Sequence, residues 1–90
     1  MSDVVDNPAE GRFEMKVEGA TAFVTYRRED GVITLNHAEV PRALEGRGIG
    51  GRLVRGTLDL VRSEGLKVVP RCSFVAAFID RNPSYQDMLK

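Results

Sequence analysis

Apolar and polar residues alternate through the first half of the chain, and this alternation predicts β-strands that bury one face. Apolar residues occupy every second position from Phe13 to Val17, within residues 11–17. Residues 20–27 are rich in β-branched and aromatic types, and the Glu29-Asp30-Gly31 sequence that follows favours a tight hairpin. A third alternating segment covers residues 32–40. Three sequential strands joined by short turns predict an antiparallel meander.

The third segment carries two polar residues of interest, His37 and Glu39. Successive side chains of a strand point to opposite sides, so odd-numbered positions share one face. We therefore expect His37 and Glu39 on the face that carries Ile33 and Leu35, about 6.5–7 Å apart along the strand.

Helical spacing replaces alternation in the second half of the chain. Apolar and small residues recur at i, i+3 and i+4 positions between residues 50 and 61, which predicts an amphipathic helix that ends at Gly65. Residues 66–69 form a short apolar segment ended by Pro70. After the helix, this strand can pair in parallel with the third one through a right-handed crossover.

The C-terminal residues predict a second helix over residues 74–81, capped by Ser73, and a last turn that begins at Pro83 and can be capped by Asn82. The predicted fold class is α+β (α/β): an antiparallel meander, a helix crossover to a parallel strand, and a C-terminal helix. The acidic, polar residues 1–10 predict a flexible N-terminal tail. Residues 11–90 are then the expected single domain.

Composition narrows the function classes. The formal net charge is zero, which argues against a protein that binds nucleic acid through an excess of basic residues. One cysteine excludes an internal disulfide and suits a reducing compartment. No apolar run approaches the roughly 18 residues of a membrane helix, and the first ten residues lack a signal-peptide pattern. We expect a cytoplasmic protein that does not enter a membrane.

A glycine-rich stretch lies between the third strand and the first helix. Gly46, Gly48, Gly50 and Gly51 are interleaved with arginines there. Glycine allows a close approach of backbone to ligand, the first N–H groups of a helix favour an anion, and arginine forms paired hydrogen bonds with phosphate. The stretch therefore predicts a phosphate cradle. It lacks the Lys-Ser/Thr ending of a nucleotide-triphosphate loop, and no neighbouring unit is long enough for a dinucleotide fold.

This stretch resembles the acetyl-CoA pyrophosphate loop of the GNAT superfamily of N-acetyltransferases, whose motif is Gln/Arg-x-x-Gly-x-Gly/Ala. Residues 45–50 align with the motif, with Gly48 and Gly50 matching and Glu45 departing from it. In this loop and in segments 37–41, 66–75 and 82–85, the chain is similar to the short, single-domain YjdJ-type subgroup. The resemblance implies a truncated GNAT fold that lacks the N-terminal helices with which larger members bind substrate.

The resemblance also implies acetyl-CoA, or CoA, as the bound cofactor. Val40 would offer its backbone to the pantetheine arm, Cys72 would lie near the thioester, and Tyr85 near the CoA sulfur. Phe74 has two interpretations, a core residue or a residue along the CoA channel, and Tyr85 has a packing role as its alternative. The pyrophosphate would be held by main-chain N–H groups of Arg47, Gly48, Ile49, Gly50, Gly51 and Arg52.

Acetyl transfer to an amine needs a proton acceptor, and the candidates for the chemistry are Glu39, His37 and Cys72. Members of the superfamily often use a carboxylate near this strand as general base, which favours Glu39, and His37 could relay a proton through water. Cys72 could act as nucleophile or acid. Each has a structural alternative: a surface carboxylate, a hydrogen-bonded histidine and a small buried thiol.

The sequence thus predicts an acetyl-CoA-dependent N-acetyltransferase that acts on a primary amine, either a protein lysine or a small molecule, by direct attack in a ternary complex. The alternative is a CoA-binding module without robust catalysis that acts as a sensor or protein partner. Nucleic-acid binding through the Arg/Gly stretch is a weaker third hypothesis. A second copy, as in a homodimer, or another protein could supply the missing acceptor surface.

Overall fold

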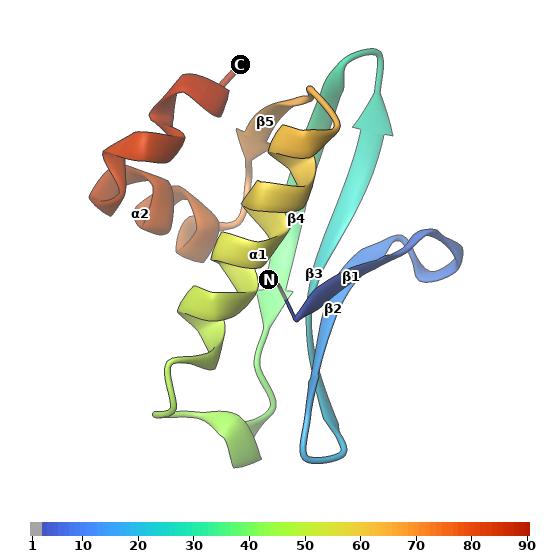
Figure 1. Ribbon diagram of the computed structural model, residues 1–90, viewed down its shortest axis with the longest axis vertical. Coiled ribbons are helices and arrows are strands. Elements are labelled where there is room, and N and C mark those ends of the chain that lie inside the picture. Colours follow the sequence, from blue (N-terminus) through green and yellow to red (C-terminus); the bar gives the residue numbers. More distant parts are fainter. Residues whose placement is uncertain (1–2) are drawn as a thin grey trace.

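Five β-strands form one mixed sheet in the order β1-β2-β3-β4-β5 in the computed structural model, which describes residues 3–90 (Figure 1). The first four strands pair as antiparallel neighbours, and β5 pairs in parallel with β4. The predicted meander and crossover are therefore confirmed. The strands are β1 (Val4–Asn7), β2 (Arg12–Val17), β3 (Ala20–Glu29), β4 (Val32–Glu39) and β5 (Lys67–Pro70).

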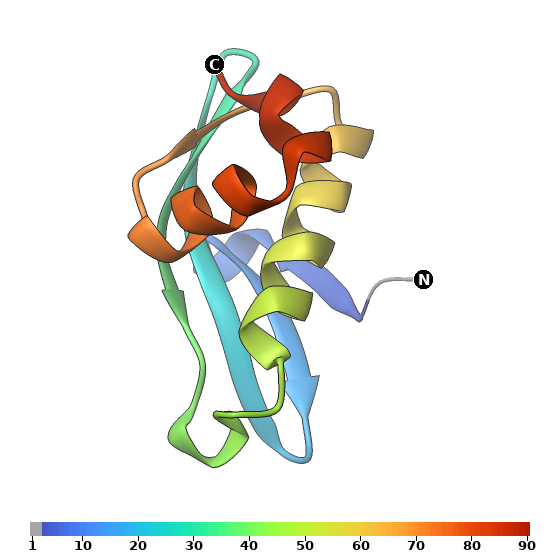
Figure 2. The same ribbon diagram turned by 90° about the vertical axis from the view of Figure 1, so that its left-hand side faces the viewer.

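Two α-helices cover one face of this sheet (Figure 2). Helix α1 crosses the sheet and contacts all five strands, and α2 packs over β4 and β5 beside it. Their apolar sides enclose the core with the inward residues of the strands, and no helix of the described residues lies on the other face of the sheet. The helices are α1 (Ile49–Ser63) and α2 (Ser73–Arg81), with short 3₁₀ turns η1 (Pro8–Glu10), η2 (Arg42–Leu44) and η3 (Pro83–Met88).

Helix α1 follows the predicted pattern closely. Leu53, Val54, Leu58 and Val61 are fully buried on its sheet side. The helix ends at Ser63, and Gly65, just beyond its C-cap Glu64, has a φ of 73° that allows its N–H to bond the Arg62 carbonyl at 3.0 Å, while the Leu66 N–H bonds the Val61 carbonyl at 3.3 Å. These two bonds satisfy carbonyls that the end of a helix leaves without partners.

The predicted flexible tail is wrong for residues 4–10. Val4–Asn7 forms β1 and pairs with β2, with Val4 opposite Met15 and 4% exposed. Pro8–Glu10 then turns the chain into β2. Burial of Val4 against the core and pairing with the edge of β2 order this segment, although its own sequence contains no alternating run. Residues 1–2 of the predicted tail lie outside the described residues.

The predicted common face of His37, Glu39, Ile33 and Leu35 is also wrong. Thr25 pairs with His37, but the next residue, Tyr26, pairs with Leu35, so Asn36 is an extra residue on β4. Such a bulge interrupts the alternation. Ile33 and Leu35 are buried before it, whereas Ala38 packs against the core after it. His37 and Glu39 consequently lie on the side away from the helices.

The predicted side-chain caps are replaced by other contacts. Cys72 rather than Ser73 is the N-cap of α2, and it makes no side-chain cap. The Asn82 amide donates to the Phe78 carbonyl at 2.7 Å instead of capping η3. Within residues 3–90, neither helix is long and apolar enough to cross a membrane.

Candidate functional site

The glycine-rich stretch forms a loop that leads from η2 into α1. Gly46 and Gly48 have φ values of 79° and 72°, which residues with a side chain rarely adopt. A Cβ atom at either position would meet nothing within 4 Å, so backbone conformation rather than space requires glycine there. Gly48 is also the N-cap of α1. The two glycines therefore turn the chain so that the helix starts with its N–H groups facing outward.

The N-terminus of α1 carries donors without helical partners. Gly48 offers no side-chain cap, and the first helical hydrogen bond runs from the Arg52 N–H to the Gly48 carbonyl at 3.2 Å. The N–H groups of Ile49, Gly50 and Gly51 precede that bond and have no carbonyl one turn back. These three donors and the positive end of the helix dipole favour an anion at this place.

Phe74 forms a wall beside this helix end. A Cβ atom on Gly50 would lie 2.8 Å from the Phe74 Cζ, so the aromatic ring occupies the space that a side chain would need. Phe74 is 41% exposed, whereas Phe78, one turn further along α2, is buried. The core interpretation of Phe74 is therefore wrong, whereas Phe78 is a core residue. The exposed ring borders the glycine loop at Gly50.

Strands β4 and β5 separate next to this wall. Their pairing ends with Leu35 opposite Pro70, and the Leu35 carbonyl accepts hydrogen bonds from the N–H groups of both Arg71 and Cys72, each at 3.0 Å. Beyond that point β4 continues to Glu39, and no strand of the part of the chain that the structure describes pairs with it on that side. Val40 follows at the end of β4, half-buried against the core. Backbone groups of residues 36–40 on that side are thus available to an extended ligand.

Cys72, His37 and Glu39 lie around this separation. The Cys72 N–H contacts β4 at Leu35, two residues before His37, and its half-buried side chain packs at the edge of the core. His37 Nε2 and Glu39 Oε1 are 3.3 Å apart. The two side chains are 60% and 59% exposed, so water reaches both. An imidazole and a carboxylate at this distance can pass a proton between them.

A family model described as GCN5-related N-acetyl-transferase matches residues 12–88. The chain belongs to the GCN5-related N-acetyltransferase family. The resemblance of the glycine loop and its flanking segments to this superfamily is thereby confirmed, and so is the fold that it implied.

Relatives of known sequence and structure agree with this assignment. The chain is 38% identical to Protein NATD1 of Bos taurus and of Homo sapiens over 52 residues, 58% of this chain and 46% of each relative. It therefore spans about half the length of these curated relatives. An NMR solution structure of a GCN5-like protein from Staphylococcus aureus superposes with a TM-score of 0.73 at 29% identity, and the match covers 100% of this chain and 91% of that one.

The two arginines of the loop are held by carboxylates in this N-acetyltransferase domain. Arg47 donates to Glu18, in the turn between β2 and β3, and Arg52 Nη2 lies 2.5 Å from Asp3 Oδ2. The hydrogen bond from Arg47 lowers the pKa of the Glu18 carboxyl, and the same contact raises the pKa of Arg47. The sequence did not predict either ion pair. Glu18 precedes Arg47 by 29 residues and Asp3 precedes Arg52 by 49 residues, so no local pattern links the partners. An anion at the loop therefore meets main-chain N–H groups and arginines that are already neutralised.

Tyr85 lies elsewhere in the fold. Its hydroxyl donates to Asp59 Oδ1 at 2.8 Å, and its ring lies 6.0 Å from that of Phe78. Asp59 follows Ile49 by ten residues, about 15 Å along α1. Burial and the hydrogen bond to Asp59 raise the pKa of the Tyr85 hydroxyl. These are the contacts of a packing residue, and they hold Tyr85 away from the glycine loop; its expected place near the CoA sulfur stays a prediction.

Metal chemistry has no candidate residues in the described part of the chain, since no three His, Cys, Asp or Glu side chains between residues 3 and 90 gather as ligands.

Proposed function

We propose that this chain transfers an acetyl group from acetyl-CoA to a primary amine. The observation that carries the proposal is the juxtaposition of three features: the outward N–H groups of Ile49, Gly50 and Gly51, the Phe74 wall, and the opening between β4 and β5. An anion site that leads into an exposed strand edge suits a ligand with a phosphate end and an amide-containing arm. Acetyl-CoA has both.

The residues present fit this ligand. The N–H groups at the start of α1 would hold the pyrophosphate, and backbone groups near Val40 would pair with the pantetheine arm. Phe74 would cover one side of that arm. The thioester would then lie toward the end of β5, where Cys72 sits against Leu35. When bound, acetyl-CoA supplies an activated acyl carbon with a thiolate leaving group.

The acid–base work falls to Glu39 and His37 in this proposal. A primary amine is protonated at neutral pH and must lose a proton before it can attack. Glu39 takes that proton, directly or through water, and His37 beside it passes it to solvent. The amine nitrogen would form a bond to the acyl carbon, the carbon–sulfur bond would break, and the sulfur would leave as a thiolate. The second proton, which the nitrogen loses as it becomes an amide, would pass through water to that thiolate. Cys72 borders the reaction and forms no acyl intermediate.

The acceptor is a primary amine, either a lysine side chain or a small molecule, and we place the reaction in the cytoplasm. No helix formed by residues 3–90 covers the side of the sheet that carries His37 and Glu39. An acceptor can therefore approach from that side, opposite the helices, and a second copy of the chain or another protein could complete the surface around it.

The proposal is tested by measuring binding and turnover separately. Calorimetric titration with CoA and acetyl-CoA establishes the loop as the binding site if a loop variant loses affinity. A panel of primary amines, with free thiol release as the readout, then establishes transfer. Binding without thiol release above the hydrolysis rate for any amine would refute the transferase function and leave the binding site standing.

Binding of CoA without thiol release corresponds to another function, that of a CoA-binding sensor. Its support is the roughly 60% exposure of His37 and Glu39, since general bases gain strength in sites that exclude water. A sensor would bind CoA and acetyl-CoA with different affinities and change its contacts with a partner.

A further inference from the structure

A hollow of about 460 Å³ lies on the side of α2 away from the glycine loop. Its position follows from the two faces of that helix. Phe74 and Phe78 point toward Gly50 and Gly51 of α1. Ala76, Ile79 and Asp80 have the i, i+3, i+4 spacing of a different face. The end of β5 and the C-terminal residues border the hollow, and its lining is Pro70, Ala76, Ile79, Asp80, Gln86 and Leu89.

The walls of this hollow are held in place by contacts outside it. The Lys90 N–H bonds the Val68 carbonyl at 3.1 Å, which fixes Leu89 beside β5. On the other side, Arg62 of α1 bonds both carboxylate oxygens of Asp87, at 3.1 and 3.0 Å. The hollow therefore exists before any ligand arrives, and its volume lies within the range of about 300–1,000 Å³ that small-molecule sites have.

The lining combines an aliphatic body with hydrogen-bond acceptors at one end. Pro70, Ala76, Ile79 and Leu89 are apolar, and Leu89 is 40% exposed, which is unusual for a leucine in this chain. At the polar end, the carboxylate of Asp80 has no hydrogen-bond or ion-pair partner among residues 3–90.

Asp80 is unusual in this fold, because most acidic side chains that lie near a basic side chain form an ion pair with it. Arg81 follows it directly and does not pair with it. The Gln86 amide donates to the main-chain carbonyl of Asp80 at 3.4 Å, so its own side-chain oxygen remains an acceptor. Asp80 also belongs to the last turn of α2, where the helix dipole favours positive charge.

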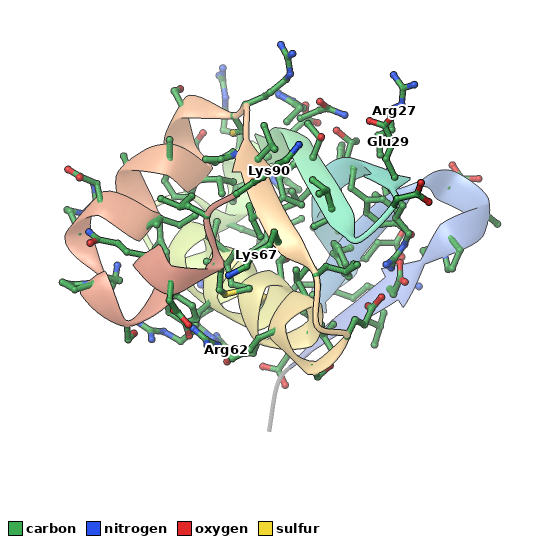
Figure 3. The ribbon with its side chains drawn as sticks, turned by 90° about the horizontal axis from the view of Figure 1, so that it is seen from above. Arg27, Glu29, Arg62, Lys67 and Lys90 are labelled. Carbon is green, nitrogen blue, oxygen red and sulfur yellow. The ribbon has the colours of Figure 1, made fainter. Side chains whose placement is uncertain are left out.

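Lys67 and Lys90 lie near the C-terminus, but neither of them pairs with the Asp80 carboxylate. The Lys67 Nζ donates to the Asp87 carbonyl at 2.7 Å, and Lys90 points across β5, away from α2 (Figure 3). Asp80 is thus the charged residue of the hollow's lining.

We propose that this hollow binds a primary ammonium ion carried on an unbranched aliphatic chain. The chain lies against Ala76, Ile79 and Leu89, and the ammonium group bonds the Asp80 carboxylate and the Gln86 oxygen. The site is separate from the glycine loop, since α2 stands between them, and it does not depend on acetyl transfer.

The test uses hexylammonium as the ligand, with hexanol and hexanoate as analogues of equal chain length, and follows the methyl signals of Ala76, Ile79 and Leu89 by NMR. We expect about millimolar binding of hexylammonium, at least about fivefold tighter than hexanol, and none of hexanoate. Asp80→Asn should remove the preference for hexylammonium over hexanol. Glu10→Gln, an equal loss of charge at the opposite edge of the sheet, should leave it unchanged.

Filling the hollow provides a second, independent variant. Ala76→Leu places three more carbons in it and should weaken hexylammonium and hexanol alike. The proposal is overturned if hexanoate binds as well as hexylammonium, if Asp80→Asn and Glu10→Gln have the same effect, or if the shifted signals lie outside the hollow. The protein's unliganded spectrum shows in each case whether the variant is folded.

Discussion

Arg47 donates two hydrogen bonds to Glu18, from Nη1 to Oε1 at 3.1 Å and from Nη2 to Oε2 at 2.9 Å. This contact joins the glycine loop to the turn between β2 and β3. It also means that a loop suited to phosphate has a carboxylate at its edge. Both side chains are exposed, so a phosphate can displace Glu18 at small cost.

Replacing Glu18 by glutamine should therefore strengthen CoA binding. The variant removes a negative charge beside the pyrophosphate site and frees the Arg47 guanidinium. We expect affinity to rise about two- to fivefold in low salt, and the gain to shrink as salt screens it. Titration calorimetry at two salt concentrations measures this, with Glu10→Gln as the control. A loss of affinity would show instead that Glu18 orders the loop.

Gly48 and Gly50 should respond differently to alanine because different constraints require glycine. Gly48 has a positive φ and open space around it, so Gly48→Ala should lower the free energy of unfolding by about 1–2 kcal/mol. Gly50 has helical backbone, but the Phe74 ring fills the position of its Cβ.

The Gly50 constraint can be isolated in a double-mutant cycle with Phe74→Ala. Alanine in a helix is favoured over glycine by about 1 kcal/mol. That gain should appear in urea unfolding when Phe74 is already alanine, and be reduced or lost when the ring is present. An equal gain in both backgrounds would mean that the ring does not press on Gly50.

Tyr85→Phe separates packing from chemistry. Losing the hydrogen bond to Asp59 should cost about 1 kcal/mol of stability, because it leaves a carboxylate without its donor. Binding of CoA and turnover should not change, since Tyr85 lies far from the loop. A turnover loss of tenfold or more, with CoA affinity intact, would show instead that Tyr85 takes part in the chemistry near the CoA sulfur.

The same variant makes a prediction about pH. Burial and the Asp59 hydrogen bond raise the pKa of Tyr85 above its ordinary value of 10.0, so the folded state holds this proton more tightly than the unfolded state does. The resulting stability is fully present below pH 10 and is lost as the pH rises through the higher, folded-state pKa. Urea unfolding from pH 9 to 11.5 should show a smaller decline in Tyr85→Phe than in the wild type.

Glu39→Gln and Cys72→Ala should have unequal effects on transfer. Removing the proposed base should lower kcat by about 10²-fold or more, with CoA affinity unchanged. Removing the thiol should lower kcat by less than about tenfold, because direct attack on the thioester needs no cysteine. Mass spectrometry of the protein mixed with acetyl-CoA alone provides the control: an acetyl group on Cys72 would contradict direct attack.

Local signals in the sequence determined most of the fold. The alternation around Phe13, the spacing from Leu53 to Val61 and the glycine at position 65 each act within a few residues, and all three were predicted correctly. The four residues of β1 were missed because their order comes from pairing with β2 and from burial of Val4, both of which are long-range.

The candidate site was predicted less completely than the fold. The glycines of the loop were recognisable, because positive φ and helix starts have local signatures. The extra residue at Asn36 was not, and it reverses the face of His37 and Glu39. The partners of Arg47 and Arg52 come from other elements of the fold and require the tertiary structure.

The central claim is that the glycine loop binds CoA, and calorimetric titration with CoA and acetyl-CoA tests it most directly. Gly48→Trp places a large ring in the loop. Gly31→Trp is the matched control, since Gly31 also has a positive φ and open space but lies in the turn between β3 and β4, at the opposite end of the sheet (Figure 1). We predict that Gly31→Trp binds as the wild type does and that Gly48→Trp loses at least about tenfold in affinity, 1.4 kcal/mol. Equal affinities in the two variants, or no binding by the wild type at millimolar CoA, would contradict the account.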